Sequence, residues 1–460
     1  MHYHPHTPED VERALKAVGV GSIRELFNDL PEALRDPEFD LPLGIDEATL
    51  LERLRTMAAK NVTSGADFLG GGARRHFIPS VVPHLAMQSE FVTSYTPYQA
   101  EVAQGILQAT FEYQTMMTEL TALPITNASM YDGASATAEA ALLAVRHTGR
   151  ERVVVSRGVH PETREVLTTY LTPLGIEIDV IDLDPLTTPT PEVSSDVAAV
   201  IVQQPNFLGY LESMEALTEA SHAAEALLVA IVDPLTLAVL KAPGEYGADI
   251  AVGDGQTIGN PVNFGGPSFG FMVVREELLR QFPGRIVGET TDVDGRRAYV
   301  LTLQAREQHI RRSKAKSNIC SNHQLTALMA AVNVAALGEQ GLREMAVGSL
   351  AKAHRLAERL AGAGHEPHTG APFFNEFVLP VSRAPALVRT QLARHGVQAG
   401  VPVPAEYGLG NAVLLSTTEL TSDAAMAHLI DALAALTGDA KTDTKTDTKT
   451  GDGLLEVAHG

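Results

Sequence analysis

The chain has 460 residues, of which 45% are hydrophobic and 20% are charged, the balance of a globular protein with a sizeable core. Its 35 basic and 56 acidic residues give a net charge of −21, which argues against nucleic acid and anionic membrane surfaces as partners. The single cysteine, Cys320, excludes a disulfide within the chain and a cysteine-based metal site, so we expect no metal and a cytoplasmic location. The apolar run 227–240 is broken by Asp233 and Pro234, so we expect no membrane span.

An N-terminal arm of short helices is predicted for residues 1–61. Thr7 begins the run Thr-Pro-Glu-Asp, a typical helix start in which the cap and the carboxylates meet N–H groups that have no partner within the helix. Further helix starts are predicted at Ser22 and around Asp46.

A large α/β domain is predicted for residues 62–323. It contains a long amphipathic helix over 101–123, where apolar residues recur every three or four positions. Short β-branched runs then alternate with helical stretches, which is typical of parallel strands buried on both faces. We therefore predict a doubly wound sheet with ligands at the carboxyl ends of its strands. Its strands are expected at 152–156, 176–183, 198–203, 227–232, 249–252 and 269–274.

A smaller α+β domain is predicted for residues 324–437. An alanine-rich helical stretch opens it, and strands around 373–379 and 412–416 flank another helix. The remaining residues, 438–460, include a repeated Lys-Thr-Asp-Thr motif that has nothing to bury, so we predict a disordered tail.

Two loops before the long helix are candidates for binding. Gly70–Gly72 allow a close approach of backbone to a ligand or another chain, or form only a tight connection. The next loop presents two phenols around a rigid proline, which suits a small polar substrate or a flat cofactor. From spacing alone, a packed aromatic turn is the preferred interpretation of this second loop. Its residues are Ser94, Tyr95, Thr96, Pro97, Tyr98 and Gln99.

Further polar residues lie at predicted element ends within the large domain. Asn127, Ser129 and Ser135 precede or begin a predicted helix over 137–146, where they form either an anion site at the helix N-terminus or an ordinary cap. Asp233 ends an apolar strand, where it could pair with the pyridinium nitrogen of pyridoxal phosphate (PLP), although Asp-Pro is also an ordinary turn.

A lysine able to form a Schiff base with PLP is missing where it would be expected, 20 to 30 residues after Asp233. Between Lys60 and Lys314 the only lysine is Lys241, in a loop that reads as a solvated turn. The segment around Gln256 and Thr257 contains no lysine.

Several blocks in order resemble the P-protein family of the glycine cleavage system, and more closely the subunit that corresponds to its N-terminal half. The resemblance covers roughly residues 3 to 437 and is carried by five segments: Phe-Leu-Gly-Gly-Gly from Phe68, Tyr-Thr-Pro-Tyr-Gln from Tyr95, the helix from Gln104, Asn-Ala-Ser-Met-Tyr-Asp-Gly-Ala-Ser-Ala from Asn127, and the run from Arg306 to Cys320.

The resemblance implies a fold type I PLP-dependent transferase architecture and a place in a hetero-oligomer with subunit 2. In that family subunit 2 carries the Schiff-base lysine, in a His-Lys-Thr setting, and the assembled enzyme decarboxylates glycine and passes the aminomethyl group to the lipoylated H-protein. Counted from Asp249, the lysine's place falls near Gln256 and Thr257, so its absence here is what the resemblance implies. The pair Arg74-Arg75 departs from the family pattern.

On this interpretation Asn127, Ser129, Ser135, Asp233 and Thr257 are remnants of a cofactor site, and no catalytic residue is expected in this chain alone. Residues 94–99 are expected to line the partner's active site. The cationic stretch 306–316 is either a solvated helix face or an interface or phosphate-facing segment. Two alternatives remain: a self-sufficient PLP-dependent lyase or aminotransferase using Lys241, and a purely structural scaffold.

Overall fold

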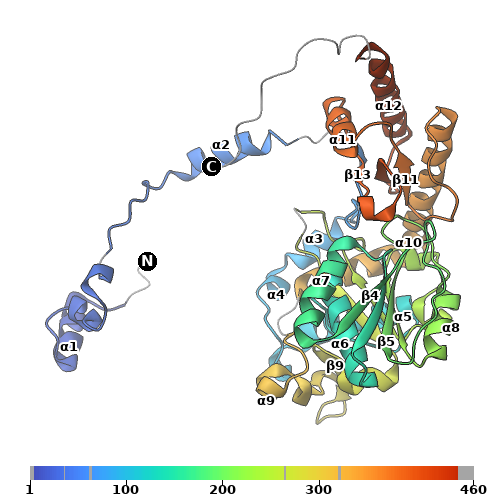
Figure 1. Cartoon of the computed structure of the whole chain (residues 1–460). Coiled ribbons are helices and arrows are strands. Elements are labelled where there is room, and N and C mark those ends of the chain that lie inside the picture. The colour runs from blue at the N-terminus through green and yellow to red at the C-terminus, as the bar shows by residue number, and fades with distance from the viewer. Residues whose placement is uncertain (1–4, 36, 62–64, 264–265, 320–322, 444–460) are drawn as a thin grey trace. The chain divides into compact units, whose positions relative to one another are not determined.

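The protein is described from a computed structural model that covers residues 5–35, 37–61, 65–263, 266–319 and 323–443 (Figure 1). It divides into two compact units, Met1–Thr63 and Ser64–Gly460. Cys320 and residues 444–460, which include most of the predicted tail, lie outside the described part of the chain.

The first unit consists of short helices whose starts agree with the sequence prediction. Helix α1 (Pro8–Val18) is capped by Thr7, whose hydroxyl accepts from the Asp10 N–H while the Asp10 carboxylate accepts from the Thr7 N–H. The segment after Ser22 forms only a short 3₁₀ helix, Ile23–Phe27, and α2 (Glu47–Ala58) begins at the predicted cap Asp46. None of the described residues in these helices is buried.

The second unit is built on a seven-stranded sheet with the order β2-β8-β7-β6-β5-β3-β4. Strands β3 to β7 are parallel, whereas β2 and β8 run antiparallel to their neighbours. The bounds are β2 Ile125–Thr126, β3 Arg152–Ser156, β4 Glu177–Ile181, β5 Val197–Gln204, β6 Leu227–Val232, β7 Ile250–Asp254 and β8 Gly270–Val274.

Two details of the predicted sheet were wrong. The strand expected at 269–274 is antiparallel to β7, because the described residues between the two strands form no crossover helix that would return the chain to the same edge. The strand expected at 176–183 is not buried on both faces, since β4 lies at the sheet edge and its side chains are exposed or half-buried. Strand β2 was not predicted.

Helices cover both faces of this sheet (Figure 1). Alternate residues of β3 point to opposite cores: Val153 and Val155 pack with α6 (Gly133–Thr148) and α7 (Pro161–Leu171), and Val154 packs in the core on the other side. That other core contains residues of α5 (Gln104–Thr121), of α8 (Met214–Ala223) and of the first part of α10 (Gln324–Gly362). The sheet is thus the middle of three layers, as the α/β prediction requires.

A third core lies around the strands of the C-terminal part. Strands β11 (Glu376–Pro380), β13 (Val401–Pro402) and β14 (Ala412–Ser416) form an antiparallel sheet, while β12 (Val397–Ala399) pairs in parallel with β1 (Ala66–Phe68). The pairing of β1 and β12 anchors the loop that follows β1, the glycine-rich loop with Gly70–Gly72, beside the C-terminal strands. Helices α11 (Pro385–Arg394) and α12 (Asp423–Asp443) complete this part, and α12 extends past residue 437, where the tail was predicted to begin.

Helix α10 joins the two larger cores, because its buried residues contribute first to one and then to the other. It is interrupted at Gly338, whose φ of 64° departs from helical geometry. By length and composition alone α10 could cross a membrane, a property that core helices of soluble proteins share.

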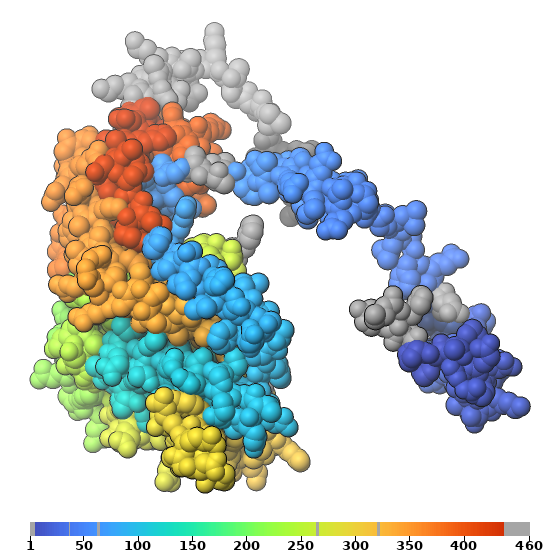
Figure 2. Space-filling model, turned by 180° about the vertical axis from the view of Figure 1, so that it is seen from behind, coloured from blue at the N-terminus to red at the C-terminus, as the bar shows by residue number. Residues whose placement is uncertain are grey.

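The segment between β1 and α5 lies on the surface of the second unit. Figure 2 shows it in light blue beside the orange α10, against which α3 (Val81–Ala86) packs. Helix α5 starts later than predicted, and Val102 is 81% exposed rather than on its buried face. The unpredicted hairpin β9 (Ile286–Thr291) and β10 (Arg297–Thr302) packs on α5 through a small apolar cluster.

Candidate functional site

A cavity of about 400 Å³ opens at the carboxyl ends of the parallel strands, where the fold predicts ligand binding. Residues at the carboxyl ends of strands β5, β6 and β7 line the cavity, and the N-terminus of α6 closes one side. The glycine-rich loop and the start of β11 complete the lining. The lining includes one arginine, Arg74, and five carboxylates: Asp132, Glu162, Asp233, Asp254 and Glu376.

Arg74 forms two ion pairs inside this cavity. Its Nη2 donates to Asp233 Oδ2 at 2.7 Å, and its Nη1 donates to Glu376 Oε2 at 2.6 Å. The side chains of all three residues are at most 12% exposed. Burial opposes the charge of Arg74, but Glu376 and Asp233 outweigh it and raise the pKa of Arg74 above its ordinary value. The guanidinium is therefore a fixed cation between two carboxylates.

Two of the predicted remnant residues meet at the same point. Thr257 Oγ1 donates to Asp233 Oδ1 at 2.5 Å, so both oxygens of this carboxylate have partners. The neighbouring Gln256 exchanges two hydrogen bonds with the backbone of Arg74, at 2.9 and 2.8 Å. The positions at which a Schiff-base lysine would be counted thus hold Asp233 and Arg74 in place.

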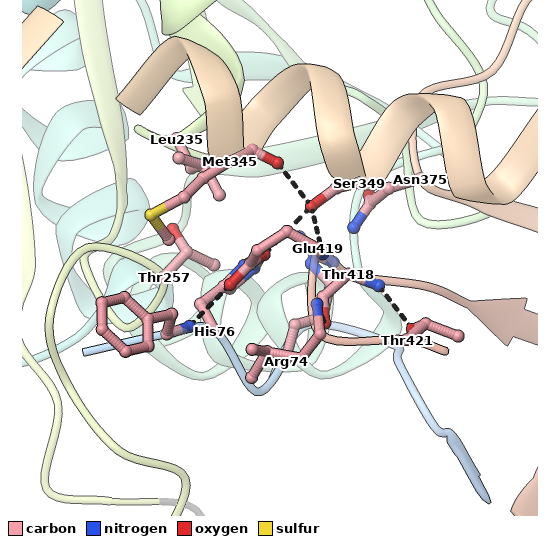
Figure 3. Close-up of polar contacts among 12 residues, drawn as sticks. Arg74, His76, Leu235, Thr257, Met345, Ser349, Asn375, Thr418, Glu419 and Thr421 are labelled. Carbon is pink, nitrogen blue, oxygen red and sulfur yellow. Dashed lines mark hydrogen bonds and ion pairs between the residues drawn. The ribbon is translucent and has the colours of Figure 1, made fainter. Parts of the chain in front are cut away.

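The loop that carries Arg74 is held by hydrogen bonds at several further points. Gly71 donates its N–H to Glu376 at 2.8 Å, and its carbonyl lies 2.8 Å from Nε2 of His160. Farther along, Nδ1 of His76 lies 2.7 Å from Oε2 of Glu419, and the Phe77 N–H donates to the same carboxylate (Figure 3). Burial disfavours the Glu419 carboxylate, but these hydrogen bonds and the attraction of His76 outweigh it and lower the pKa of Glu419.

Carboxylates occupy the N-terminus of α6. Asp132 is the cap and accepts from the Ser135 N–H at 2.7 Å, and Asp254 accepts from the Gly133 N–H at 3.3 Å. Ser268 Oγ also donates to Asp254, at 2.5 Å. Burial raises the pKa of Asp254, and nearby Asp132 adds to the rise against the opposing hydrogen bonds. Ser135, predicted as a remnant of a phosphate site, acts here in a capping box with Asp132.

Asn127 and Ser129 do not line this cavity. Asn127 is buried and donates to the Pro283 carbonyl at 3.1 Å. Ser129 is also buried, and it lines a small pocket together with Pro97 and Arg285. The segment predicted as one phosphate site therefore divides between two places in the fold.

The residues of the cavity do not fit PLP. The carboxylate expected to pair with the pyridinium nitrogen already holds Arg74, and carboxylates stand where a phosphate would bind. No lysine occurs in the described lining. Lys241 forms an ion pair with Glu215 at 3.0 Å and is half-exposed, as predicted for a solvated turn.

Residues 94–99, the tyrosine loop, lie on the surface. With Arg285, Glu307 and His309 they form a second polar cluster, the tyrosine group. Tyr95 is 73% exposed and Tyr98 is 45% exposed. Arg285 Nη2 donates to the Tyr98 hydroxyl at 2.8 Å, and its guanidinium carbon lies 5.1 Å from the centre of the Tyr98 ring. Glu307 lies 3.5 Å from Nε of Arg285, and the His309 ring contacts Tyr98 edge-on at 5.4 Å between ring centres. A buried ion pair thus orients an exposed phenol.

The other residues of this loop make local contacts. Ser94 Oγ donates to the Phe91 carbonyl at 2.7 Å, and the Thr96 carbonyl accepts from the Tyr98 N–H at 2.9 Å. Gln99 caps the following 3₁₀ turn through its carbonyl, which accepts from the Val102 N–H. These contacts give the loop a defined shape around its two tyrosines.

The cationic stretch 306–316 is not one helix face, because it contains only the short helix α9 (Gln308–Arg311) between 3₁₀ turns. Arg306 is partly buried and donates to the carbonyls of Phe282 and Gly284. The stretch also supplies Glu307 and His309 to the tyrosine group. It therefore lies beside the tyrosine loop.

The sequence analysis did not identify most of the charged residues in the cavity and in the tyrosine group. Arg74 carried a signal, since it departs from the pattern of the family that the chain resembles. Asp254 lies in the Gly-Asp-Gly run and could have been singled out as a strand-end carboxylate. Arg285 and Glu376 carried no local signal, because they meet their partners only through the fold.

Comparisons with known proteins give a consistent result. The family described as "Glycine cleavage system P-protein" matches residues 1–433. A protein of Carboxydothermus hydrogenoformans named probable glycine dehydrogenase (decarboxylating) subunit 1 is 49% identical over 446 residues, which cover 94% of this chain and 99% of that one. A protein of Moorella thermoacetica with the same name is 49% identical over 442 residues, 95% of this chain and 98% of that one.

Solved structures give the same result. A crystal structure of inhibitor-bound glycine decarboxylase (P-protein) has 53% sequence identity and a TM-score of 0.89, covering 95% of this chain and 100% of that chain. A cysteine desulfurase of Thermococcus onnurineus, at 15% identity and a TM-score of 0.60, covers 87% of this chain and all of its own and shares the fold alone. The fold type I prediction is confirmed.

Proposed function

The chain belongs to the glycine cleavage system P-protein family as its subunit 1, and from this premise we propose that it acts with subunit 2 to decarboxylate glycine and to pass the aminomethyl group to the H-protein. In the proposed reaction the bond to the glycine carboxylate breaks and carbon dioxide leaves. The electron pair stays on the aminomethyl carbon, which forms a bond to one sulfur of the lipoyl disulfide while the S–S bond breaks, and the other sulfur leaves as a thiolate that takes up a proton from solvent.

We assign PLP, the electron sink of the assembled enzyme, to a covalent site on subunit 2. The lining of the cavity in this chain supports that assignment, because Arg74 already forms an ion pair with Asp233 and no lysine is among the described residues of the lining. The alternative of a self-sufficient lyase or aminotransferase needs Lys241 at the cofactor. Its ion pair with Glu215, outside the cavity lining, argues against that alternative.

The observation that carries the proposal is the tyrosine group. The Tyr98 oxygen accepts a hydrogen bond from Arg285, so its own O–H can donate outward to an acceptor such as a carboxylate. Arg285 is itself held by buried Glu307, which fixes the direction of the phenol. We propose that residues 94–99 reach the active site of subunit 2, where Tyr98 and Tyr95 help to position glycine. A scaffold role would leave these hydroxyls without effect on turnover.

A partner surface is also proposed for the first unit. Its helices bury none of their described residues, and it exposes large apolar side chains, among them Phe39 at 75% and Leu43 at 94%. An exposed apolar surface of this kind can serve as a binding surface for another chain. We propose subunit 2 as that chain, in a complex with two copies of each subunit. The net charge of −21 and the single cysteine support a cytoplasmic complex that binds neither nucleic acid nor membrane.

Assembly can be tested by mixing the purified subunits. Obligate interfaces commonly bury more than about 2,000 Å², so we expect the equimolar mixture to elute as a heterotetramer with little free chain. Light scattering coupled to size exclusion measures the mass directly, and the 49.0 kDa chain alone is the reference. A monomer of this chain persisting in the equimolar mixture would contradict the proposed assembly.

A further inference from the structure

We propose that the cavity at the strand ends is a latent cofactor site in which side chains of this chain replace both charged ends of the cofactor. Arg74 replaces the pyridinium, and Asp254 with Asp132 replaces the phosphate. The ligand class that the cavity would accept after Arg74 is removed is a planar aromatic cation. This inference is independent of the proposed catalytic role of the complex, which concerns the cofactor of subunit 2.

The geometry at Asp233 supports the replacement of the pyridinium by Arg74. A protonated pyridine would offer this carboxylate one planar N–H⁺ donor, and the guanidinium of Arg74 offers a planar N–H⁺ donor at 2.7 Å. The second nitrogen of Arg74 reaches Glu376 at 2.6 Å, so the cation is shared between two buried carboxylates. Thr257 completes the set by donating to the other Asp233 oxygen at 2.5 Å.

The anionic end lies at the N-terminus of α6. A phosphate would normally accept from N–H groups at such a terminus and would be favoured by the helix dipole. Here the Gly133 N–H donates to Asp254 and the Ser135 N–H donates to Asp132. A phosphate dianion at this place would lose those donors and would meet two carboxylates, which disfavours it electrostatically.

Lack of space does not explain the exclusion. The cavity of about 400 Å³ lies within the range of ligand pockets, roughly 300–1,000 Å³. The groups that a cofactor would pair with are already paired, so the site is closed by charge and hydrogen bonding. Removing the Arg74 guanidinium should leave the carboxylates of Asp233 and Glu376 without a counter-ion, and a cationic ligand that replaces it should bind.

The test uses the full-length chain and two probes, pyridoxamine and pyridoxamine 5′-phosphate. Both lack the aldehyde of PLP, so they cannot attach to surface lysines and report the cavity alone. Probe fluorescence gives the affinity, and the rise in melting temperature with probe concentration gives an independent measure. The variants are Arg74→Ala and the double variant Arg74→Ala with Asp254→Asn. Exposed Arg75, changed to alanine, is the matched control.

We expect wild type and Arg75→Ala to bind both probes only weakly. Arg74→Ala should bind pyridoxamine at least about tenfold more tightly than wild type and should prefer it to the phosphate ester, because one charged hydrogen bond corresponds to about that factor. Adding Asp254→Asn should strengthen binding of the phosphate ester by a further factor of about ten and reverse the preference.

Two results would overturn the inference. One is wild-type binding of pyridoxamine 5′-phosphate as tight as that of the double variant, and the other is a folded Arg74→Ala that binds neither probe. If Arg74→Ala is unfolded alone, methylguanidinium supplied during refolding should restore its thermal transition, because it replaces the lost cation. Failure of that rescue would also count against the inference, since Arg74 would then act through more than its charge.

Discussion

Replacing Arg74 by methionine should lower the free energy of unfolding by about 3–5 kcal/mol, because it leaves two buried carboxylates without their counter-ion. Methionine is similar in length and apolar, so the loss of the charge dominates over the loss of packing. Urea unfolding of the full-length chain at neutral pH measures the difference.

Arg75→Met is the control, because Arg75 is exposed and next in sequence. A surface change of this kind should stay within about 0.5 kcal/mol of wild type. An Arg74→Met variant as stable as Arg75→Met would show that the two ion pairs contribute no net stability, and the role given to Arg74 would lose its structural basis.

Tyr98→Phe should lower turnover of the assembled complex by about tenfold to a hundredfold while leaving its assembly and melting temperature nearly unchanged. The change removes the hydroxyl that Arg285 orients, and a hydrogen bond to a charged group contributes about 1.5–3 kcal/mol. Tyr95→Phe should lower turnover less, because a neutral hydrogen bond contributes about 0.5–1.5 kcal/mol. Steady-state turnover with subunit 2, H-protein and glycine is the measurement.

Tyr407→Phe provides the matched control for these variants. Its hydroxyl also makes a hydrogen bond, to the Arg157 carbonyl at 3.1 Å, but it belongs to the C-terminal core. Its loss should affect stability and leave turnover intact. If Tyr95→Phe and Tyr98→Phe both behave like Tyr407→Phe, the loop only packs, as spacing alone suggested.

Local signals in the sequence predicted much of the fold. The cap at Thr7 set the start of α1, and the β-branched runs gave the bounds of β3 and β6 as observed. These features depend on residues near one another in the chain, so composition and periodicity determine them. The direction of a strand is not determined by nearby residues in this way. The sequence of β8 resembles the sequences of the parallel strands, and only the course of the connection from β7 makes β8 antiparallel.

The sites were harder to predict, because their charged pairs join distant parts of the chain. Arg74 is 159 residues from Asp233 and 302 from Glu376, and Tyr98 is 187 from Arg285. The sequence marked Asp233 and Thr257 as remnants and Tyr98 as a candidate. It could not show that Arg74 occupies Asp233 or that Arg285 orients Tyr98, since those relations exist only in the folded chain.

Exchange of labelled bicarbonate into the carboxyl group of glycine tests the central claim most directly. The chain with PLP alone, subunit 2 with PLP alone, and both together are each assayed with lipoylated H-protein. We expect exchange only when both subunits are present, and no loss when Lys241 is changed to alanine, because that side chain pairs with Glu215 outside the cavity. Exchange by this chain without subunit 2, or borohydride trapping of PLP on Lys241, would contradict the account.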